Sequence, residues 1–176
     1  MDVFDAIAKR YSYRGAFTDA AVPRADLERI VRAGLAAPSA GNSQTTSFVI
    51  VDDPVKLERL AEIIPNSTPL RTAKAVIVTC LDKADPQSER PDFSMVNYGI
   101  AVENVMLALT ALGYAALWME GWKRAEGAQA AVAKLLGLPD SFVVQVLIPL
   151  GVAEAPGTPR DKRPFNERAW WNTYGG

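Results

Sequence analysis

Hydrophobic residues along the chain alternate between helical spacing and short continuous apolar runs. Helical spacing predicts four helices, over residues 3–10, 24–36, 54–64 and 125–136. The first of these helices ends near Arg10. Continuous runs predict strands over residues 48–51, 75–81, 115–119 and 142–151. This alternation favours an α+β sandwich around one sheet. A doubly wound dinucleotide fold is disfavoured because no strand is followed by a Gly-x-Gly-x-x-Gly turn.

Capping and breaking residues support several of these boundaries. Asp2 can cap the first helix, and Asp53 followed by Pro54 is typical of a helix start. Pro38 stops the second helix, and residues 65–69 (Pro-Asn-Ser-Thr-Pro) indicate a loop after the third. The polar segment 82–91 is expected to be exposed, and it is our candidate for a lid.

The segment 93–112 is apolar nearly all round, which predicts a central buried helix ended by Gly113. Its length is borderline for a membrane span, but Asn97, Glu103 and Asn104 within it favour a core helix. The tail 152–176 contains three prolines, four basic residues and the pair Trp170-Trp171. Such an aromatic tail is expected to pack on a surface, and we expect that surface to be a partner subunit.

Length and charge bound the class of protein. With 176 residues, 49% of them hydrophobic, one domain spanning residues 1–176 is expected. The formal net charge is −1 with both signs interspersed, so no basic field suggests nucleic acid or a membrane surface. No apolar run resembles a signal peptide or is long enough to cross a bilayer, and we therefore expect a cytoplasmic protein that binds a small molecule.

The residue types that are rare or missing restrict the chemistry. The chain has no histidine, which excludes Ser-His-Asp and Cys-His catalysis and histidine-ligated metal sites, and we assign no metal site. The single cysteine, Cys80, lies in an apolar run and is expected to be a buried structural residue. Catalysis would therefore depend on a borrowed organic cofactor.

Two polar segments in the first quarter of the chain could bind such a cofactor. In Arg10-Tyr11-Ser12-Tyr13-Arg14, two arginines flank a hydroxyl and can grip a phosphate through charge-assisted hydrogen bonds. The alternative is that both arginines are solvated loop residues. The second segment, residues 37–44 (Ala-Pro-Ser-Ala-Gly-Asn-Ser-Gln), offers amides and side-chain dipoles to a polar ring edge, and the same turn also stops a helix.

These two segments resemble the N-terminal fingerprints of the nitroreductase family, which binds flavin mononucleotide (FMN). Three later segments extend the resemblance over nearly the whole chain. They are the apolar helix at 99–108, Trp118-Met119-Glu120-Gly121, and Leu150-Gly151 with residues 162–167. The chain departs from the family pattern after Gln44, where Thr45-Thr46 replaces the frequent Pro-Trp.

The resemblance implies a nitroreductase-like fold with a mainly antiparallel central sheet flanked by helices. It further implies a long buried dimer-forming helix and a C-terminal extension that crosses to the partner subunit. The backbone of Glu120 and Gly121 would lie near flavin N5, and no side chain is assigned as acid or base. Asn66 would lie near the pyrimidine edge of the flavin. Trp118 and Trp122 could be core residues or pocket walls. The cofactor-binding residues that the resemblance implies are Arg10, Tyr11, Ser12, Arg14, Pro38, Ser39, Asn42, Gln44, Asn66, Glu120, Gly121, Lys162 and Arg163.

The implied activity is that of a homodimeric FMN-dependent oxidoreductase. It would take hydride from NADH or NADPH and reduce a nitroaromatic, quinone or related small acceptor by a ping-pong mechanism. The family supports several chemistries on one scaffold, so reductive dehalogenation and flavin breakdown remain alternatives. The alternative outside the enzymes is a protein that binds flavin and catalyses no reaction.

Overall fold

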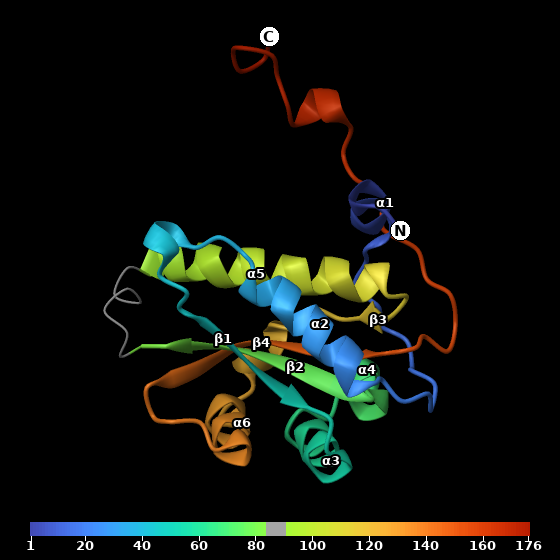
Figure 1. Ribbon diagram of the computed structural model, residues 1–176, viewed down its shortest axis with the longest axis vertical. Helices are drawn as coiled ribbons and strands as arrows, with labels where there is room; N and C mark the ends of the chain where they lie inside the picture. The colour runs from blue at the N-terminus through green and yellow to red at the C-terminus, as the bar shows by residue number, and fades with distance from the viewer. Residues whose placement is uncertain (84–90) are drawn as a thin grey trace.

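The computed structural model describes residues 1–83 and 91–176 (Figure 1). Most of segment 82–91, the candidate lid, therefore lies outside the described residues. The helices are α1 (Val3–Lys9), α2 (Arg24–Leu35), α3 (Pro54–Ile63), α4 (Thr68–Thr72), α5 (Pro91–Ala111) and α6 (Ala128–Leu136), with 3₁₀ turns η1 (Ala40–Asn42), η3 (Gly121–Arg124) and η4 (Phe165–Glu167). The strands are β1 (Thr46–Val51), β2 (Ala75–Asp82), β3 (Ala115–Ala116) and β4 (Phe142–Gly151).

The described strands form one four-stranded sheet in the order β1-β2-β4-β3, and every pair is antiparallel. The expected α+β architecture with an antiparallel sheet is thus confirmed. The strand predicted at 115–119 is regular only at Ala115–Ala116. Leu117 donates its N–H to the carbonyl of Pro149, but proline has no N–H to return the bond, so the ladder is interrupted there.

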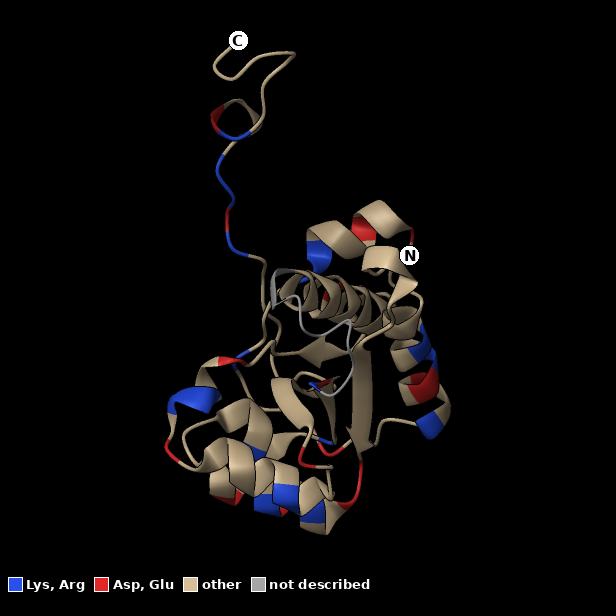
Figure 2. Cartoon of the chain, turned by 90° about the vertical axis from the view of Figure 1, so that its left-hand side faces the viewer, with Lys and Arg blue, Asp and Glu red and all other residues tan. Residues whose placement is uncertain are grey.

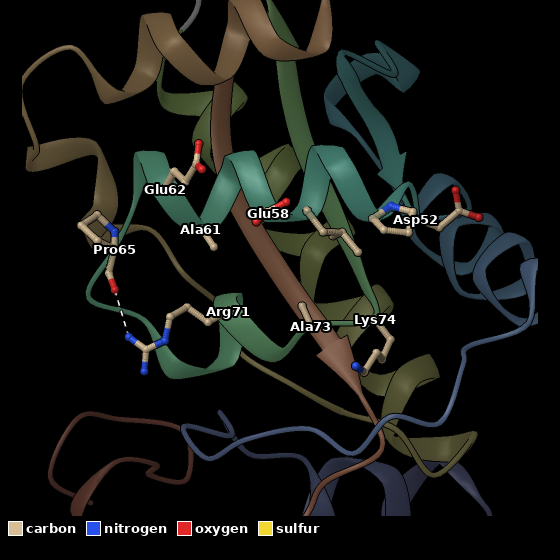
Figure 3. A pocket seen from close by; sticks show the side chains of 10 residues that line it. Asp52, Glu58, Ala61, Glu62, Pro65, Arg71, Ala73 and Lys74 are labelled. Carbon is tan, nitrogen blue, oxygen red and sulfur yellow. Dashed lines mark hydrogen bonds between the residues drawn. The ribbon is translucent and has the colours of Figure 1, made fainter.

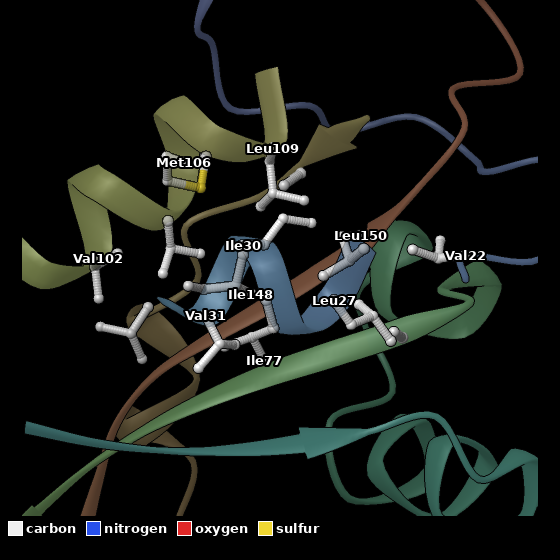
Figure 4. Packing of buried hydrophobic residues seen from close by; sticks show 14 of the residues in the cluster. Val22, Leu27, Ile30, Val31, Ile77, Val102, Met106, Leu109, Ile148 and Leu150 are labelled. Carbon is white, nitrogen blue, oxygen red and sulfur yellow. The ribbon is translucent and has the colours of Figure 1, made fainter. Parts of the chain in front are cut away.

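Strand β2 is buried on both faces, which explains its continuous apolar run. Successive side chains of a strand point to opposite faces. Ala75, Ile77 and Leu81 accordingly join one apolar cluster, whereas Val76, Val78 and Cys80 join the other. Figure 4 shows the first cluster, in which the labelled side chains of α2 lie between those of α5 and those of β2 and β4.

The helices cover the two faces of the sheet separately. Helices α2 and α5 pack on one face, and α3, α4 and α6 lie on the other (Figure 1). Helix α2 approaches α5 closely at Gly34, where an added Cβ would lie 2.7 Å from Cγ2 of Val105. A glycine in this helix interior is therefore explained by packing rather than by backbone conformation.

The helix α4 was not expected, because residues 65–69 indicated a loop. Ser67 caps α4 by accepting a hydrogen bond from the N–H of Leu70 at 3.3 Å, and Pro69 occupies the first turn. The Ser-Thr-Pro sequence is thus a helix start rather than a continuation of the loop. Similarly, the helix predicted at 125–136 begins only at Ala128, after a 3₁₀ turn.

Helix α5 is buried on one side only within the single chain. Val102, Val105 and Met106 are fully covered, whereas Met95 on the other side is 63% exposed. Helix α1 also exposes apolar residues, including Phe4 at 79%. Among the helices of residues 1–83 and 91–176, none has both the length and the apolar character needed to span a membrane.

The tail after β4 leaves the body of the protein (Figure 1). Its aromatic residues contact one another rather than the core, since the ring centroids of Trp170 and Tyr174 lie 4.3 Å apart and those of Phe165 and Trp171 lie 6.2 Å apart. Trp171 is 76% exposed. The surface on which the tail was expected to pack is therefore not supplied by the body of the same chain.

Burial makes Cys80 an unreactive thiol, and this leads to a first prediction. Removal from water raises the pKa of Cys80 to about 11, so the thiol is protonated at neutral pH. Ellman's reagent should react slowly with the native protein at pH 8 and rapidly after unfolding in guanidinium. The variant Cys80→Ser should keep its activity and lose about 1–3 kcal/mol of stability, because a hydroxyl is then buried. Rapid labelling of the folded protein would contradict this assignment.

Candidate functional site

Backbone pairing places the first predicted phosphate-binding segment beside the sheet. Ser12 forms a parallel bridge with Ala116, and the N–H of Tyr13 donates to the carbonyl of Ala116 at 2.8 Å. Further along, Phe17 pairs with Ala153. The segment 10–17 is therefore held between β3 and the chain that leaves β4.

The residues of this segment open onto a cavity of about 210 Å³. Its lining comes from two parts of the chain that are far apart in sequence: Arg10, Tyr11, Ser12, Arg14, Thr158, Pro159, Arg160 and Lys162. Five of these eight residues, namely Arg10, Tyr11, Ser12, Arg14 and Lys162, are among the predicted cofactor-binding residues. Arg160 was not predicted, and the predicted Arg163 is not in the lining. The tail in Figure 2 shows the basic segments that lead out of this region.

The cavity is rich in positive charge. Four of its lining residues are arginine or lysine, and Arg10 pairs with Glu103 on α5, whose Oε1 lies 2.9 Å from Nε of Arg10. Burial raises the pKa of Glu103 above its ordinary value, against the opposing attraction of Arg10 and Lys162. The guanidinium, ammonium and hydroxyl donors of this lining are the groups that suit a doubly charged phosphate.

The tail closes on this cavity at Gly157. An added Cβ there would lie 2.6 Å from Cε2 of Tyr11, so only a glycine allows the backbone to run so close to the ring. This contact guides residues 158–162 to the mouth of the cavity.

The second predicted segment forms a separate pocket of about 450 Å³. Pro38, Ser39 and Gln44 line it, as do residues of α2, β1 and α5. Asn42 is exposed at the tip of the loop and is not in the lining. The hydroxyl of Ser39 accepts a hydrogen bond from the N–H of Gln44 at 3.0 Å, which closes the loop on itself.

One residue of this pocket was not identified as functional from the sequence. The side chain of Asn97 on α5 accepts a hydrogen bond from the N–H of Ala40 at 3.1 Å and donates to the hydroxyls of Ser43 and Thr45 at 3.2 and 3.4 Å. The available signal was an amide in an otherwise apolar helix, because a buried amide needs partners.

The turn at Glu120 and Gly121 is fixed by side chains from three elements. Glu120 Oε1 accepts hydrogen bonds from Tyr98 at 3.2 Å and from Lys123 at 2.9 Å. Lys123 also donates to Gln145 at 3.3 Å. Gln145 is the extra residue of a bulge in β4, since Thr79 pairs with Val146 and Cys80 with Val144.

These contacts keep Glu120 ionised at neutral pH. Burial opposes its charged form, but hydrogen bonds from Lys123, Tyr98 and Trp118 outweigh burial and hold the pKa of Glu120 below its ordinary value. An added Cβ at Gly121 would meet no atom within 4 Å, so the backbone there is open to a flat ligand. The network thus positions an accessible backbone turn.

The remaining candidates occupy less specific positions. Asn66 is exposed in the loop between α3 and α4. The next residue, Ser67, contacts the sulfur of Met119 at 3.5 Å, which brings the loop toward the Glu120 turn. Trp122 is buried in the core, which favours its interpretation as a core residue over that as a pocket wall. Trp118 is partly buried and hydrogen-bonded to Glu120.

The structure does not unite the two predicted halves of the site in one chain. The cavity at Arg10 and the pocket at Ser39 share no lining residue. They adjoin α5 through different residues, since Arg10 pairs with Glu103 whereas Ala40 is bonded to Asn97.

A third hollow, of about 550 Å³ between α3 and α4, is unrelated to these residues (Figure 3). Four of its five charged lining residues, Asp52, Glu62, Arg71 and Lys74 but not Glu58, have a hydrogen-bond or ion-pair partner among the described residues. Arg71 donates to the carbonyl of Pro65 at 3.1 Å, and Lys74 pairs with Asp19 at 2.8 Å. Asp52 and Glu62 also have arginine partners, Arg24 and Arg59. This hollow offers few unengaged charges to a ligand.

Known proteins share both the sequence and the fold. A protein of Archaeoglobus fulgidus with the provisional name NADH dehydrogenase/NAD(P)H nitroreductase is 33% identical over 153 residues, which cover 86% of this chain and 82% of that protein. A similarly named crystal structure from Bacteroides thetaiotaomicron superimposes with a TM-score of 0.84 at 26% identity and covers 98% of both chains.

A third relative has a name that specifies its ligands. The NADPH:FMN oxidoreductase of Vibrio harveyi, solved in complex with NAD⁺, superimposes with a TM-score of 0.82 at 26% identity over 98% of this chain and 77% of that one. Residues 7–80 and 65–152 of the present chain match the sequence profile of the Nitroreductase family. With this match, the two polar segments and the common fold, the chain belongs to the nitroreductase family.

Proposed function

We propose that this protein is a homodimeric FMN-dependent oxidoreductase. It oxidises NADH or NADPH and reduces a nitroaromatic, a quinone or a related small acceptor in a ping-pong cycle. The observation that supports this proposal best is the cationic cavity formed by Arg10, Ser12, Arg14 and Lys162, since it suits a phosphate. The Vibrio harveyi relative, an NADPH:FMN oxidoreductase by name, supports the choice of flavin and electron donor.

Different residues of the chain bind different parts of FMN in this proposal. Arg10, Ser12, Arg14 and Lys162 hold the phosphate, with Arg163 adding positive charge nearby, and Tyr11 forms a wall of the same cavity. Pro38, Ser39, Asn42 and Gln44 offer polar groups and backbone to the ring and ribityl chain, and Asn66 adds a polar side chain near the pyrimidine edge. When bound, FMN would supply the hydride and electron transfer that amino-acid side chains do not provide.

The turn at Glu120 and Gly121 has a positioning and electrostatic role in this proposal. Its backbone would lie near the redox-active edge of the flavin, where a fixed amide would favour developing negative charge. Tyr98, Lys123 and Gln145 hold this turn in place. We assign no side chain as acid or base; water or the backbone amide serves protonation.

A second subunit completes the site. The two binding segments line separate cavities in one chain, so a ligand that touches both requires one of them from a partner. Helices α1 and α5 and the aromatic tail all expose apolar residues, which would be covered in a dimer: Phe4, Ile7, Met95, Val96, Phe165 and Trp171.

The direct test is the identity and reactivity of the bound cofactor. The purified protein should be yellow, and the flavin released by heat should co-elute with FMN rather than FAD. Anaerobic addition of NADH or NADPH should bleach its absorbance, and a panel of acceptors should restore it. A colourless protein that cannot be reconstituted with FMN would refute the proposal, and a flavin that neither nucleotide reduces would favour a binding module.

Removal of Arg10 should weaken FMN selectively. Arg10→Ala deletes a charge-assisted contact worth about 1.5–3 kcal/mol, which corresponds to about a tenfold to hundredfold loss of affinity. The affinity for riboflavin, which has no phosphate, should not fall. Fluorescence titration of both flavins measures this.

Two controls make the Arg10 result interpretable. Arg59→Ala removes an exposed arginine of α3 that pairs with Glu62, and it should change neither affinity. Arg10→Ala also leaves Glu103 without its partner, so Arg10→Ala combined with Glu103→Gln separates the lost attraction from new repulsion. Equal losses for FMN and riboflavin would contradict a phosphate contact.

Truncation of the tail should affect assembly and cofactor together. A chain ending at Ala155 lacks Lys162, Arg163 and the tail aromatics, so both dimer stability and FMN occupancy should fall. In contrast, Trp170→Ala combined with Trp171→Ala keeps the basic residues and should weaken the dimer at least as much as it weakens FMN binding. Analytical ultracentrifugation and flavin absorbance report the two effects. A monomeric full-length protein with full FMN occupancy would rule out the shared site.

A further inference from the structure

The loop that follows α2 has an unusual backbone. Three of its residues adopt positive φ angles: Gly41 at 59°, Asn42 at 56° and Gln44 at 52°. Positive φ is uncommon for residues other than glycine, and such conformations persist only where the surrounding structure enforces them. Something outside the loop must therefore hold Asn42 and Gln44 in place.

Burial of the loop does not provide this constraint. Gly41, Asn42 and Gln44 are all exposed, and an added Cβ at Gly41 would meet no atom within 4 Å. Within the loop, local bonds join Ser39 to Asn42 and Gln44, and Ala40 to Ser43. These bonds close short turns, but they do not attach the loop to the body of the protein.

The attachment comes from Asn97. This side chain is 4% exposed and lies on the apolar helix α5. It bonds to the loop at three points, namely the N–H of Ala40 and the hydroxyls of Ser43 and Thr45. Ala40 and Thr45 flank the positive-φ stretch and Ser43 lies within it, so the three contacts fix its span and its orientation.

We propose that Asn97 is a positioning residue that keeps the loop in the shape needed to contact the flavin ring. The inference rests on the proposed function, because it assigns the loop to the ring and ribityl chain. It extends that function by naming the group that forms this half of the site before the ligand arrives. A loop held in advance costs less conformational entropy when it binds.

Asparagine suits this position because its amide accepts and donates at once. The carbonyl oxygen takes the backbone N–H, while the amide nitrogen serves the hydroxyls. Aspartate would keep the acceptor, and the hydroxyls of Ser43 and Thr45 could rotate to donate to it. Leucine branches at the same carbon atom, is somewhat larger, and satisfies none of the three.

The experiment compares the binding of FMN and riboflavin to the full chain after its flavin has been removed. Asn97→Leu should weaken both flavins equally, by at least about tenfold, since the loss of a buried hydrogen-bond partner has this magnitude. The preference for FMN over riboflavin should be unchanged because the phosphate cavity is intact. Asn97→Asp should recover affinity to within about threefold of the original protein, since its carboxylate still accepts the N–H of Ala40, now with the added strength of a charged acceptor.

Asn104→Leu is the matched control. Asn104 lies on the same helix and donates one hydrogen bond to the carbonyl of Ala33 on α2, and within the described part of the chain its side chain bonds to none of residues 39–45. This variant should bind both flavins normally. If it lost affinity to the same extent as Asn97→Leu, a general effect of α5 would explain both, and the proposal would fail.

A second variant decides the matter if Asn97→Leu does not fold. Ser43→Ala combined with Thr45→Val removes the two loop hydroxyls and leaves α5 unchanged, and it should weaken both flavins in the same ratio. Unchanged affinity for riboflavin in whichever variant folds would overturn the role of Asn97. If the unaltered protein binds neither flavin, the proposed function itself fails, which is a different outcome.

Discussion

The fold depends on the burial of β2 and β4 between two apolar layers. Each strand sends alternate side chains to opposite faces, so Ile77 and Ile148 meet α2 and α5 while Val76 and Leu147 meet the helices of the other face. Neither layer could be removed without exposing half of each strand. The edge segments, including residues 12–17, take their positions from this central pair.

Helix α5 is the common support of the candidate site. It is apolar enough to pack on the sheet, but three of its polar side chains reach out to three different segments. Glu103 pairs with Arg10, Asn97 bonds to the loop at 40–45, and Tyr98 bonds to Glu120. Each of these three side chains has a partner, so its polar group is compensated where it leaves the apolar face of the helix. The same helix thus contacts the cationic cavity, the loop and the backbone turn.

The long elements were predictable from sequence because their signals are local. The helix after Asp53 and the strand ending at Gly151 follow directly from capping and apolar runs. The short elements were predicted less well, for two different reasons. Helix α4 has a local signal, the cap at Ser67 followed by Pro69, but the prolines and polar residues around it also indicate a loop. The interruption after Ala116 depends on Pro149, a residue on another strand, and has no local signal.

The residues of the candidate site likewise divide into those with a local sequence signal and those that depend on distant contacts. Arg10, Ser12 and Arg14 are close in sequence and form one visible motif, and the cavity indeed gathers them. Arg160 and Asn97 were missed, because their roles arise from contacts with residues far away in sequence. The tail's path over Tyr11, fixed by Gly157, is likewise a property of the folded chain.

The cavity at Arg10 also sets an order of events during synthesis. Its walls come from residues 10–14 and from residues 158–162, so the first wall is made long before the second. A nascent chain that has formed the sheet as far as β2 still lacks half of the cations around the cavity. The full set of four cations around the cavity is therefore available only after residue 162 has been synthesised.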